Sequence, residues 1–594
     1  MRILMVPLDP VHDVALKMLR RELLKNGHEV VLLPPDMKVE EVVEICRLEK
    51  PSVIMVSRTV GYGAAEVLGR FIDLLDAAGL RKGCKVIVGG KAITKELAAE
   101  LGYDAGFGEG TEWEEVIAYV EGRPVKRRIC ENERKKRDIT EGYSYRLLDE
   151  AFFKPLEDIA AQIIEWASGK CSPGVERAKV RERMLSGTDA LKDYIDLCEE
   201  PVKSFYTRGE IPKKVRLVGT EEVSKFKRFI DGLTVPVGSS LASMSKPLVF
   251  VQYGTGCPFM DGMHIKVCEA WGADGFLHFD PSWGARVEGL LEGVLSHEED
   301  GTIVTLENLK LIKSLLGEST LWSVRAHRGL NTPETVLLAA YVGADLTKIN
   351  MVYGSLNGGT DPERLLVDGV YAIRLAARFN LPFDIPTNEE LGGVPAYKAF
   401  AGMLVVAYLG LKLGARPILK PLFCYSPDVM ISGYMEDNYV DYNVAKIWAL
   451  REIIDAPIWA GEPIGFMTHT EERVQSALTT ALHAGLAKSL NLDAITIAST
   501  DEAYSRGAIT SSSRIDTLRA LKEAFRFLGE VKFEPTCRAK SFKEAIKEGI
   551  LKTLEEIARR GDFLSSLYEG LLGTREEGAN PGRVGRGSVS RCLV

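Results

Sequence analysis

The sequence predicts an α/β protein that contains two separate sets of alternating strands and helices. Residues 2–122 alternate between a short apolar strand and a helix five times. A second alternation begins at residue 246 and gives eight strand–helix pairs before residue 530. Near-continuous apolar strands, such as residues 494–498, are typical of parallel sheets that are buried on both faces. Both sets therefore predict parallel sheets covered by helices.

The first set has the strand count of a flavodoxin-like, Rossmann-type domain, which we assign to residues 1–122. Its strands are expected near residues 2–8, 29–34, 52–57, 85–88 and 104–107. In such a sheet, ligands bind outside the carboxyl ends of the strands. The residues that directly follow each strand are therefore the first place to look for a binding site.

Residues 123–245 change in character and predict a helical connector. The segment opens with the basic run 126–137, and two stretches rich in Glu, Lys and Arg follow at 148–167 and 175–197. We interpret the basic run as a solvated face, with binding of a tail as the alternative.

Residues 246–530 predict a (β/α)8 barrel, the TIM-barrel fold, because eight strands are each followed by a helix. The strands are expected at 246–253, 273–280, 319–326, 344–352, 381–387, 415–422, 456–462 and 492–499. The remaining residues, 531–594, predict one or two helices and a Gly/Arg-rich tail from residue 580 that extends over another surface.

Composition narrows the classes of partner. The net charge of −8 and the pI near 5.8 argue against a nucleic-acid surface, which requires a basic stripe. Ten cysteines include no C-x-x-C pair, so free thiols in a reducing compartment are expected. The sequence starts without an apolar leader, so we expect a cytoplasmic protein. We expect no membrane partner, because the longest apolar stretch (400–411) is too short to span a bilayer. We also expect a homo-oligomer.

Polar and small residues follow the strands of the first set. The loop after the first strand, Asp9-Pro10-Val11-His12-Asp13, offers an imidazole between two carboxylates. The candidate cofactor-binding residues at this and the other strand ends are Asp9, His12, Asp13, Ser57, Thr59, Gly89, Gly90, Gly108, Gly110 and Thr111. One imidazole among small residues at a sheet edge predicts a site for a large cofactor.

This combination resembles the cobalamin-binding domain of adenosylcobalamin-dependent mutases and methionine synthase. The family loop is Asp-x-His-x-x-Gly. His12 matches its histidine, whereas Pro10 takes the place of the aspartate, with Asp9 one position earlier, and Ala15 takes the place of the glycine. The resemblance implies that His12 is the lower axial ligand of cobalt and that the Ser and Gly-Gly positions line a channel for the nucleotide tail. The alternative, a histidine that caps the helix or faces solvent, stays open.

Arginines follow neighbouring strands of the predicted barrel. Arg286 follows the second strand, and Arg325 and Arg328 follow the third. Together they are candidates for a substrate-binding clamp, because guanidinium groups hold carboxylates with bidentate hydrogen bonds. The loop after the fourth strand contains Asn357 and Gly358, which would allow close approach of a flat cofactor ring.

Two glutamates at later strand ends are the candidate catalytic residues. Glu462 follows the seventh strand and Glu502 follows the eighth. They are suited to accept protons or to bind ribose hydroxyls. The alternative for both is a salt bridge at the mouth of the barrel.

The predicted barrel resembles the large subunit of glutamate mutase (methylaspartate mutase), in residues 325–338 and 495–529. By position, Glu502 matches a glutamate that contacts the adenosyl ribose in that family, whereas Gly254 and Ala498 stand where the family has an arginine and a lysine. The resemblance implies an adenosylcobalamin-dependent radical isomerase, a carbon-skeleton mutase acting on a small carboxylic acid. It also implies that the corrin lies between the first domain and the barrel.

Two other functions remain open. An aminomutase that also uses pyridoxal phosphate would need Lys348 or Lys420, on predicted barrel strands, to form the Schiff base. A corrinoid carrier or sensor without mutase activity is favoured by the altered histidine loop and by Ala498.

Overall fold

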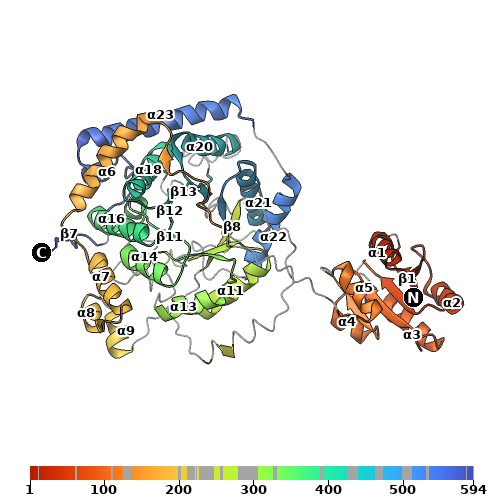
Figure 1. Cartoon of the computed structure of the whole chain (residues 1–594). Coiled ribbons are helices and arrows are strands. Elements are labelled where there is room, and N and C mark those ends of the chain that lie inside the picture. The colour runs from red at the N-terminus through yellow and green to blue at the C-terminus, as the bar shows by residue number, and fades with distance from the viewer. Residues whose placement is uncertain are drawn as a thin grey trace. The chain divides into compact units, whose positions relative to one another are not determined.

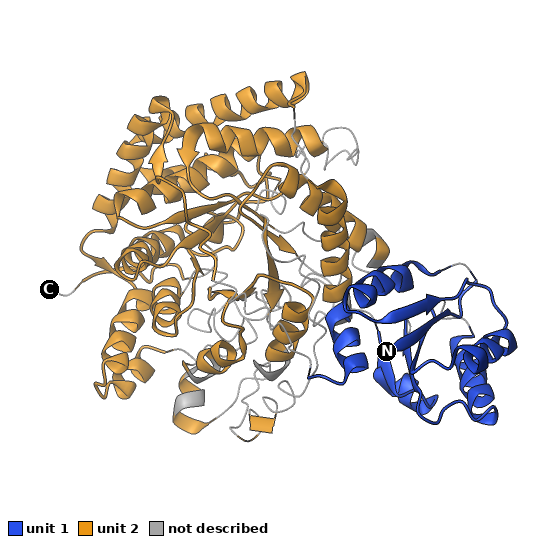
Figure 2. Ribbon diagram, turned by 45° about the vertical axis from the view of Figure 1, so that its right-hand side comes forward, with its two compact units in different colours: residues 1–133 blue, residues 134–594 orange. Residues whose placement is uncertain are grey.

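A computed structural model shows the chain as two compact units, unit 1 (residues 1–133) and unit 2 (residues 134–594), drawn in two colours in Figure 2. The residues that it describes are 1–10, 12–59, 63–91, 93–108, 111–124, 136–198, 202–209, 221, 224–225, 247–253, 258–278, 306–325, 331–387, 393–424, 439–461, 473–497, 511–529, 534–582 and 585–592.

Unit 1 contains a parallel five-stranded sheet of order β2-β1-β3-β4-β5 within its described residues. Its strands are β1 (Arg2–Pro7), β2 (Glu29–Leu32), β3 (Val53–Ser57), β4 (Lys85–Gly89) and β5 (Ala105–Phe107). Its helices are α1 (Val14–Lys25), α2 (Val39–Glu49), α3 (Ala64–Ala77), α4 (Lys95–Glu100) and α5 (Trp113–Glu121). Each strand lies where the sequence predicts one, and the order is that of a flavodoxin-like sheet. The flavodoxin-like prediction is therefore confirmed.

Helices cover both faces of this sheet because alternate strand residues are apolar on both sides. Ile3 and Met5 of β1 join a core cluster with α1 and α5, whereas Leu4 and Val6 join a second cluster with α2, α3 and α4. A sheet buried on both faces exposes polar groups only at its ends and edges. The loops at the carboxyl ends of the strands are therefore the natural binding edge of unit 1.

Unit 2 contains eight parallel strands within its described residues. They are β8 (Leu248–Tyr253), β9 (Gly275–His278), β10 (Leu321–Ser323), β11 (Thr347–Lys348), β12 (Phe383–Pro386), β13 (Pro417–Lys420), β15 (Trp459–Ala460) and β16 (Ala494–Ile497). Each lies inside a segment predicted as a strand. They form two parallel sheets, of order β10-β9-β8-β16-β15 and β11-β12-β13.

Two isolated parallel bridges connect these sheets. Ser323 bridges to Leu346, which joins β10 to the start of β11, and Leu419 bridges to Ile458, which joins β13 to the start of β15. Pairing therefore runs through all eight described strands in chain order and returns from β16 to β8. Figure 1 shows these strands surrounded by helices.

The helices of unit 2 follow its strands and are apolar on the side that faces them. They are α11 (Pro258–Ala270), α13 (Leu306–Leu315), α14 (Thr332–Tyr341), α15 (Tyr353–Leu356), α16 (Pro362–Arg378), α18 (Ala396–Lys412), α20 (Tyr439–Ile453), α21 (Arg473–Ser489) and α22 (Ser511–Leu528). Val249 and Phe383 belong to the large core cluster between strands and helices. Leu248 and Ile418, on the other side of their strands, belong to a separate cluster with Trp459.

The first described residues of unit 2, 136–147, bind to the start of several strands. Lys136 forms an ion pair with Asp345 (2.7 Å), and Arg137 forms one with Asp274. Ile139 joins the cluster that contains Leu248 and Ile418. Because Asp274 and Asp345 each lie close before a strand, this segment covers the amino-terminal end of the strands.

An outer layer packs on the inner helices. It consists of β6 (Arg146–Leu147), a 3₁₀ turn (Glu150–Phe152), α6 (Phe153–Ala167), β7 (Lys170–Cys171), α7 (Pro173–Leu185), α8 (Leu191–Asp196), α9 (Val202–Arg208), β14 (Ile454–Asp455), α23 (Cys537–Arg560), α24 (Phe563–Tyr568) and β17 (Ser590–Arg591). Helices α6 and α23 contact α18, and α7 contacts α14. As a result, α18 is buried over most of its length (Figure 1).

The segment expected to be a connector is thus part of this packing in its described portion. Residues 136–198 lie in unit 2 and contact its helices. Burial of Phe152, Leu156 and Ile159 accounts for this, since each is at most 1% exposed. The division of the chain at residues 122, 245 and 530 stays a prediction. None of the described helices has the length and apolar content for a membrane span.

We predict that unit 2 loses stability in mild acid because two histidines are buried without charge. Burial lowers the pKa of His483 to about 3, and burial together with Arg514 lowers the pKa of His264 to about 4. The unfolded chain protonates each ring near pH 6.5, the ordinary value. Between these values the unfolded state holds more protons, so the free energy of unfolding falls as pH falls through this window.

Urea unfolding between about pH 7 and pH 5 measures this loss, which reaches about 1.4 kcal/mol per pH unit for each histidine. His483→Gln removes one titrating group and should reduce the slope of stability against pH. The same slope in the variant and in the unchanged protein would contradict the assignment.

Candidate functional site

The loop after β1 is anchored by a buried carboxylate. Asp9 is 1% exposed, and its Oδ2 accepts a hydrogen bond from the backbone N–H of Thr59 at 2.6 Å. The backbone carbonyl of Asp9 accepts a second one from the N–H of Asp36 at 2.9 Å. Asp9 therefore ties the end of β1 to the loops that follow β2 and β3.

His12 lies on this loop with a half-exposed side chain. Its Nδ1 is 4.0 Å from Oδ1 of Asp9, a distance longer than a hydrogen bond but with the carboxylate facing the ring. The other nearby carboxylate, Asp13, forms an ion pair with Lys17 at 2.7 Å instead. Of the two carboxylates that the sequence offered, Asp9 is thus the one placed to orient the imidazole.

Small polar residues lie at the neighbouring strand ends. Ser57 closes β3 and is 8% exposed, and Thr59 is exposed two residues later. Thr111, after β5, donates its backbone N–H to the carbonyl of Gly108 at 3.3 Å. Because β1 pairs directly with β3, these residues and His12 share one edge of the sheet. Gly110 lies outside the described residues.

Two of the predicted glycines have a structural reason within unit 1. Gly90 has a φ of +153°, and a Cβ added there would lie 1.9 Å from the carbonyl oxygen of Arg58. A Cβ on Gly108 would lie 2.3 Å from the carbonyl oxygen of Ile93. Close backbone contact therefore accounts for both glycines without a cofactor. Gly89, at the end of β4, is less constrained, with its nearest contact at 3.3 Å.

In unit 2, side chains on the inner side of the strands form an interior polar layer. Its described members are each at most 2% exposed. Most of them lie two residues after an apolar residue of the cluster around Trp459. They are Gln252, Ser323, Arg325, Lys348, Asp384, Lys420 and Thr496. Among these described members, three side chains are cationic and one is a carboxylate, and buried charges of this kind require partners.

Asp384 lies at the centre of this layer. It is fully buried, is paired in register with Lys348, and its Oδ2 is 4.0 Å from Nζ of Lys420. Within the described part of the chain, neither carboxylate oxygen has a hydrogen-bond partner. Nζ of Lys420 also lies 4.7 Å from the ring centre of Trp459, whose Nε1 donates to Thr496 at 2.8 Å.

Asp384 is not among the site residues predicted from the sequence, although its place within an apolar strand segment pointed to a special role. The residue is the one charged side chain within the apolar strand segment 381–387 (Leu-Pro-Phe-Asp-Ile-Pro-Thr). An acidic residue in a strand buried on both faces must be paired or hydrogen-bonded. Its position in β12 therefore indicated an interior charge cluster.

The structure describes some of the other site residues that the sequence predicts in unit 2, whereas the rest lie outside its described residues. Arg325 is 2% exposed and lies two residues after Ser323, so its side chain is on the same side of the strand. This places Arg325 in the interior polar layer. Asn357 and Gly358 follow α15, and a Cβ on Gly358 would lie 2.4 Å from the carbonyl oxygen of Gly354. The remaining predicted residues, Arg286, Arg328, Glu462 and Glu502, lie outside the described residues.

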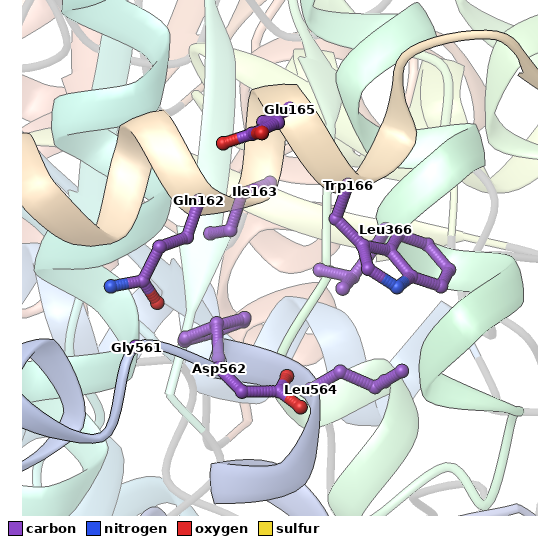
Figure 3. Close-up of a pocket in the computed structure, with 9 residues that line it drawn as sticks. Gln162, Ile163, Glu165, Trp166, Leu366, Gly561, Asp562 and Leu564 are labelled. Atoms are coloured by element: carbon purple, nitrogen blue, oxygen red, sulfur yellow. The ribbon is translucent and has the colours of Figure 1, made fainter.

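A cavity of about 400 Å³ lies elsewhere in unit 2 (Figure 3). Gln162 and Trp166 of α6 line it together with Leu366 of α16 and residues 561–564. Figure 3 shows the side chains of Gln162, Trp166 and Asp562 around it. None of the residues predicted from the sequence lines this cavity.

Comparison with known protein families shows which kind of domain unit 1 contains. The family described as "B12 binding domain" matches residues 3–118. Residues 3–118 are therefore a B12-binding domain. The match spans β1 to α5, and so includes every predicted cofactor-binding residue of unit 1.

Curated relatives resemble part of the chain. The beta subunit of lysine 5,6-aminomutase from Fusobacterium nucleatum is 35% identical over 97 residues, which cover 16% of this chain and 35% of the relative. The same subunit from Acetoanaerobium sticklandii is 40% identical over 70 residues, covering 11% and 27%. The chain thus spans about a third of these relatives or less. A solved cobalamin-binding protein from Desulfitobacterium hafniense is 26% identical over 18% of this chain and 51% of its own, with a TM-score of 0.17.

The residues at the binding edge fit a cobalamin. A neutral imidazole is a common metal ligand, and its second nitrogen normally faces a carboxylate or carbonyl that fixes the tautomer. In the B12-binding domain, His12 presents a half-exposed ring while buried Asp9 faces its Nδ1. Nε2 is then the nitrogen available to cobalt.

We predict that Asp384→Asn destabilises unit 2. The change keeps the shape of the side chain but leaves Lys420 and Lys348 without their buried carboxylate. Loss of one partner of a buried ion pair typically costs about 3 kcal/mol, which urea unfolding would measure. Asp196→Asn, on an exposed face of α8, is the matched control and should change the free energy of unfolding by less than about 0.5 kcal/mol. Equal stability of the two variants would show that Asp384 does not compensate these lysines.

Proposed function

We propose that this protein is an adenosylcobalamin-dependent radical isomerase, a carbon-skeleton mutase that acts on a small carboxylic acid. The observation that carries the proposal is His12, half-exposed at the binding edge of a B12-binding domain with buried Asp9 facing its Nδ1. The similarity of part of the chain to a subunit of a mutase supports an enzyme of the isomerase kind.

The second part of the proposal is that unit 2 is a (β/α)8 barrel. The parallel pairing of eight described strands in cyclic order supports it, as does the helix that follows most of these strands. In such a barrel the residues at the carboxyl ends of the strands contact the substrate. Lys420 ends β13 and Arg325 follows β10, so the interior polar layer reaches this end.

In this proposal, His12 would hold the cofactor through its cobalt, and Asp9 would keep the imidazole in the tautomer that leaves Nε2 free. Ser57 and Thr59, at the adjacent strand end, offer hydroxyl groups to the polar tail of the cofactor. When bound, adenosylcobalamin supplies a carbon-centred radical that removes a hydrogen atom from the substrate.

The residues of the interior polar layer would bind and orient the substrate. Arg325 holds a carboxylate with two parallel hydrogen bonds, whereas Lys348 and Lys420 contribute point charges. Because these groups are nearly fully buried, an anionic substrate bound to them is removed from water, which strengthens each electrostatic contact. Fixing a substrate by its charged end also orients the carbon that must react.

A second candidate is an aminomutase that uses pyridoxal phosphate together with cobalamin. Both curated relatives are subunits of an aminomutase, which favours this function. Lys348 and Lys420 favour it too, since a lysine amine forms Schiff bases with aldehydes. Incubation with pyridoxal phosphate followed by borohydride reduction separates the two functions. A stable adduct on Lys348 or Lys420, located by mass spectrometry, supports the aminomutase.

We predict that His12→Ala weakens binding of adenosylcobalamin by at least about tenfold and changes its visible spectrum. The unchanged protein should bind the cofactor with its own base displaced from cobalt, and the variant should lose this spectral form. Spectral titration in the dark measures both quantities. Asp9→Asn should reduce affinity less, because it keeps the ligand but weakens control of the tautomer.

His28→Ala is the matched control, because His28 lies at the start of β2 and bonds Glu121 at 3.0 Å. It should leave the spectrum unchanged. If His12→Ala binds the cofactor with the same spectrum and affinity as the unchanged protein, His12 is not the cobalt ligand. If the cofactor binds but no radical signal appears with any small carboxylic acid, the protein is a corrinoid carrier.

A further inference from the structure

Two cysteines from distant parts of the chain meet in the outer layer of unit 2. Strand β17 pairs antiparallel with β7, with Ser590 opposite Cys171 and Arg591 opposite Lys170. The backbone N–H of Cys592 continues the pairing with the carbonyl of Gly169 at 2.8 Å. Positions two apart on a strand share a face, so Cys592 lies on the same face as Ser590, diagonal to Cys171.

The two cysteines share one packed cluster and are unbridged. Both cysteines are free, and Cys592 packs against the apolar cluster of Cys171, Val175 and Val367. Cys171 is 4% exposed, and burial raises its pKa to about 11, whereas Cys592 is partly exposed. An outside reagent therefore reaches Cys592 first.

The segment that ends at Cys592 also supports a predicted cofactor loop. The backbone N–H of Asn580 donates to the carbonyl of Leu356 at 2.7 Å, directly before Asn357. Nη1 of Arg364, on α16, donates to Oγ of Ser588 at 3.1 Å. The C-terminal segment, whose described residues are 580–582 and 585–592, is thus fastened at one end to the loop after β11 and at the other to β7.

We propose that Cys171 and Cys592 form a reversible redox latch, in which a low-molecular-weight disulfide converts the two thiols into a disulfide bond. This bond locks the C-terminal segment across α16. The proposal does not depend on the reaction that the protein catalyses.

The chemistry takes two exchange steps. The thiolate of Cys592 attacks one sulfur of the oxidant, breaks its S–S bond and releases one thiol, which carries the proton from Cys592. The thiolate of Cys171 then attacks the sulfur of Cys592 and releases the second thiol with the proton from Cys171. The protein loses two electrons and two protons, and the oxidant is reduced to two thiols. A shift of the two-residue strand β17 brings the sulfurs to bonding distance, about 2.05 Å.

The test is incubation of the full chain with glutathione disulfide, followed by alkylation and tryptic mass spectrometry without reductant. We expect a peptide that contains Cys171 linked to the C-terminal peptide that begins at Cys592, lighter by two hydrogen atoms than the separate thiols. Dithiothreitol should reverse the link. In addition, after limited tryptic cleavage at exposed Arg586, the fragment that contains Cys592 should be protected from release in the oxidised protein until dithiothreitol is added, because the disulfide retains it.

Cys592→Ser should abolish the linked peptide and the protection of the fragment, with unchanged thermal unfolding of the reduced protein. Cys537→Ser is the matched control, because Cys537 is exposed on α23, and it should change neither result. If glutathione attaches to Cys592 and stays there as a mixed disulfide with no link to Cys171, the latch does not exist. A link from Cys592 to any other cysteine would overturn the proposal equally.

Discussion

The alternation of side chains along the strands of unit 2 is the constraint on which the rest of that unit depends. In β13, Leu419 faces the helices, while Ile418 and Lys420 face the inner side. Along each strand, the inner side therefore carries an apolar residue of the cluster around Trp459 and then, two residues further toward the carboxyl end, often a charged or polar one. Because little water reaches these groups, each charge requires a nearby partner. Asp384, between the lysines of the neighbouring strands, is a described side chain that meets part of this requirement.

A related constraint positions the binding edge of unit 1. Parallel strands end at the same edge, so loops that are far apart in sequence become neighbours there. Asp9 stabilises this arrangement, because its buried carboxylate accepts the N–H of Thr59 from another loop. The same carboxylate faces His12. One side chain thus holds the loop in place and orients the imidazole, which links the stability of the fold to the proposed cobalt ligand.

Two segments of unit 2 have no clear apolar periodicity in the sequence and still become structured. Residues 136–147 place Ile139 against the inner cluster, and Lys136 and Arg137 bind acidic residues before two strands. The C-terminal segment pairs with β7, which lies early in unit 2. Both segments obtain their structure from contacts with unit 2 rather than from local propensity. A covalent bond at Cys592 would therefore change how firmly the segment that ends there supports the loop after β11.

The sequence by itself determined the positions of the strands and helices, because apolar periodicity is a local property that short segments carry. It also proposed His12 and Arg325 as candidate binding residues, since both lie at or just beyond the ends of predicted strands. Only the tertiary structure decided that Asp9 rather than Asp13 faces His12, and that Gly90 and Gly108 serve backbone packing. Only the tertiary structure placed Asp384 beside Lys420 and Cys592 beside Cys171. Those relations depend on contacts between residues far apart in the chain, which strand pairing creates and local sequence does not encode.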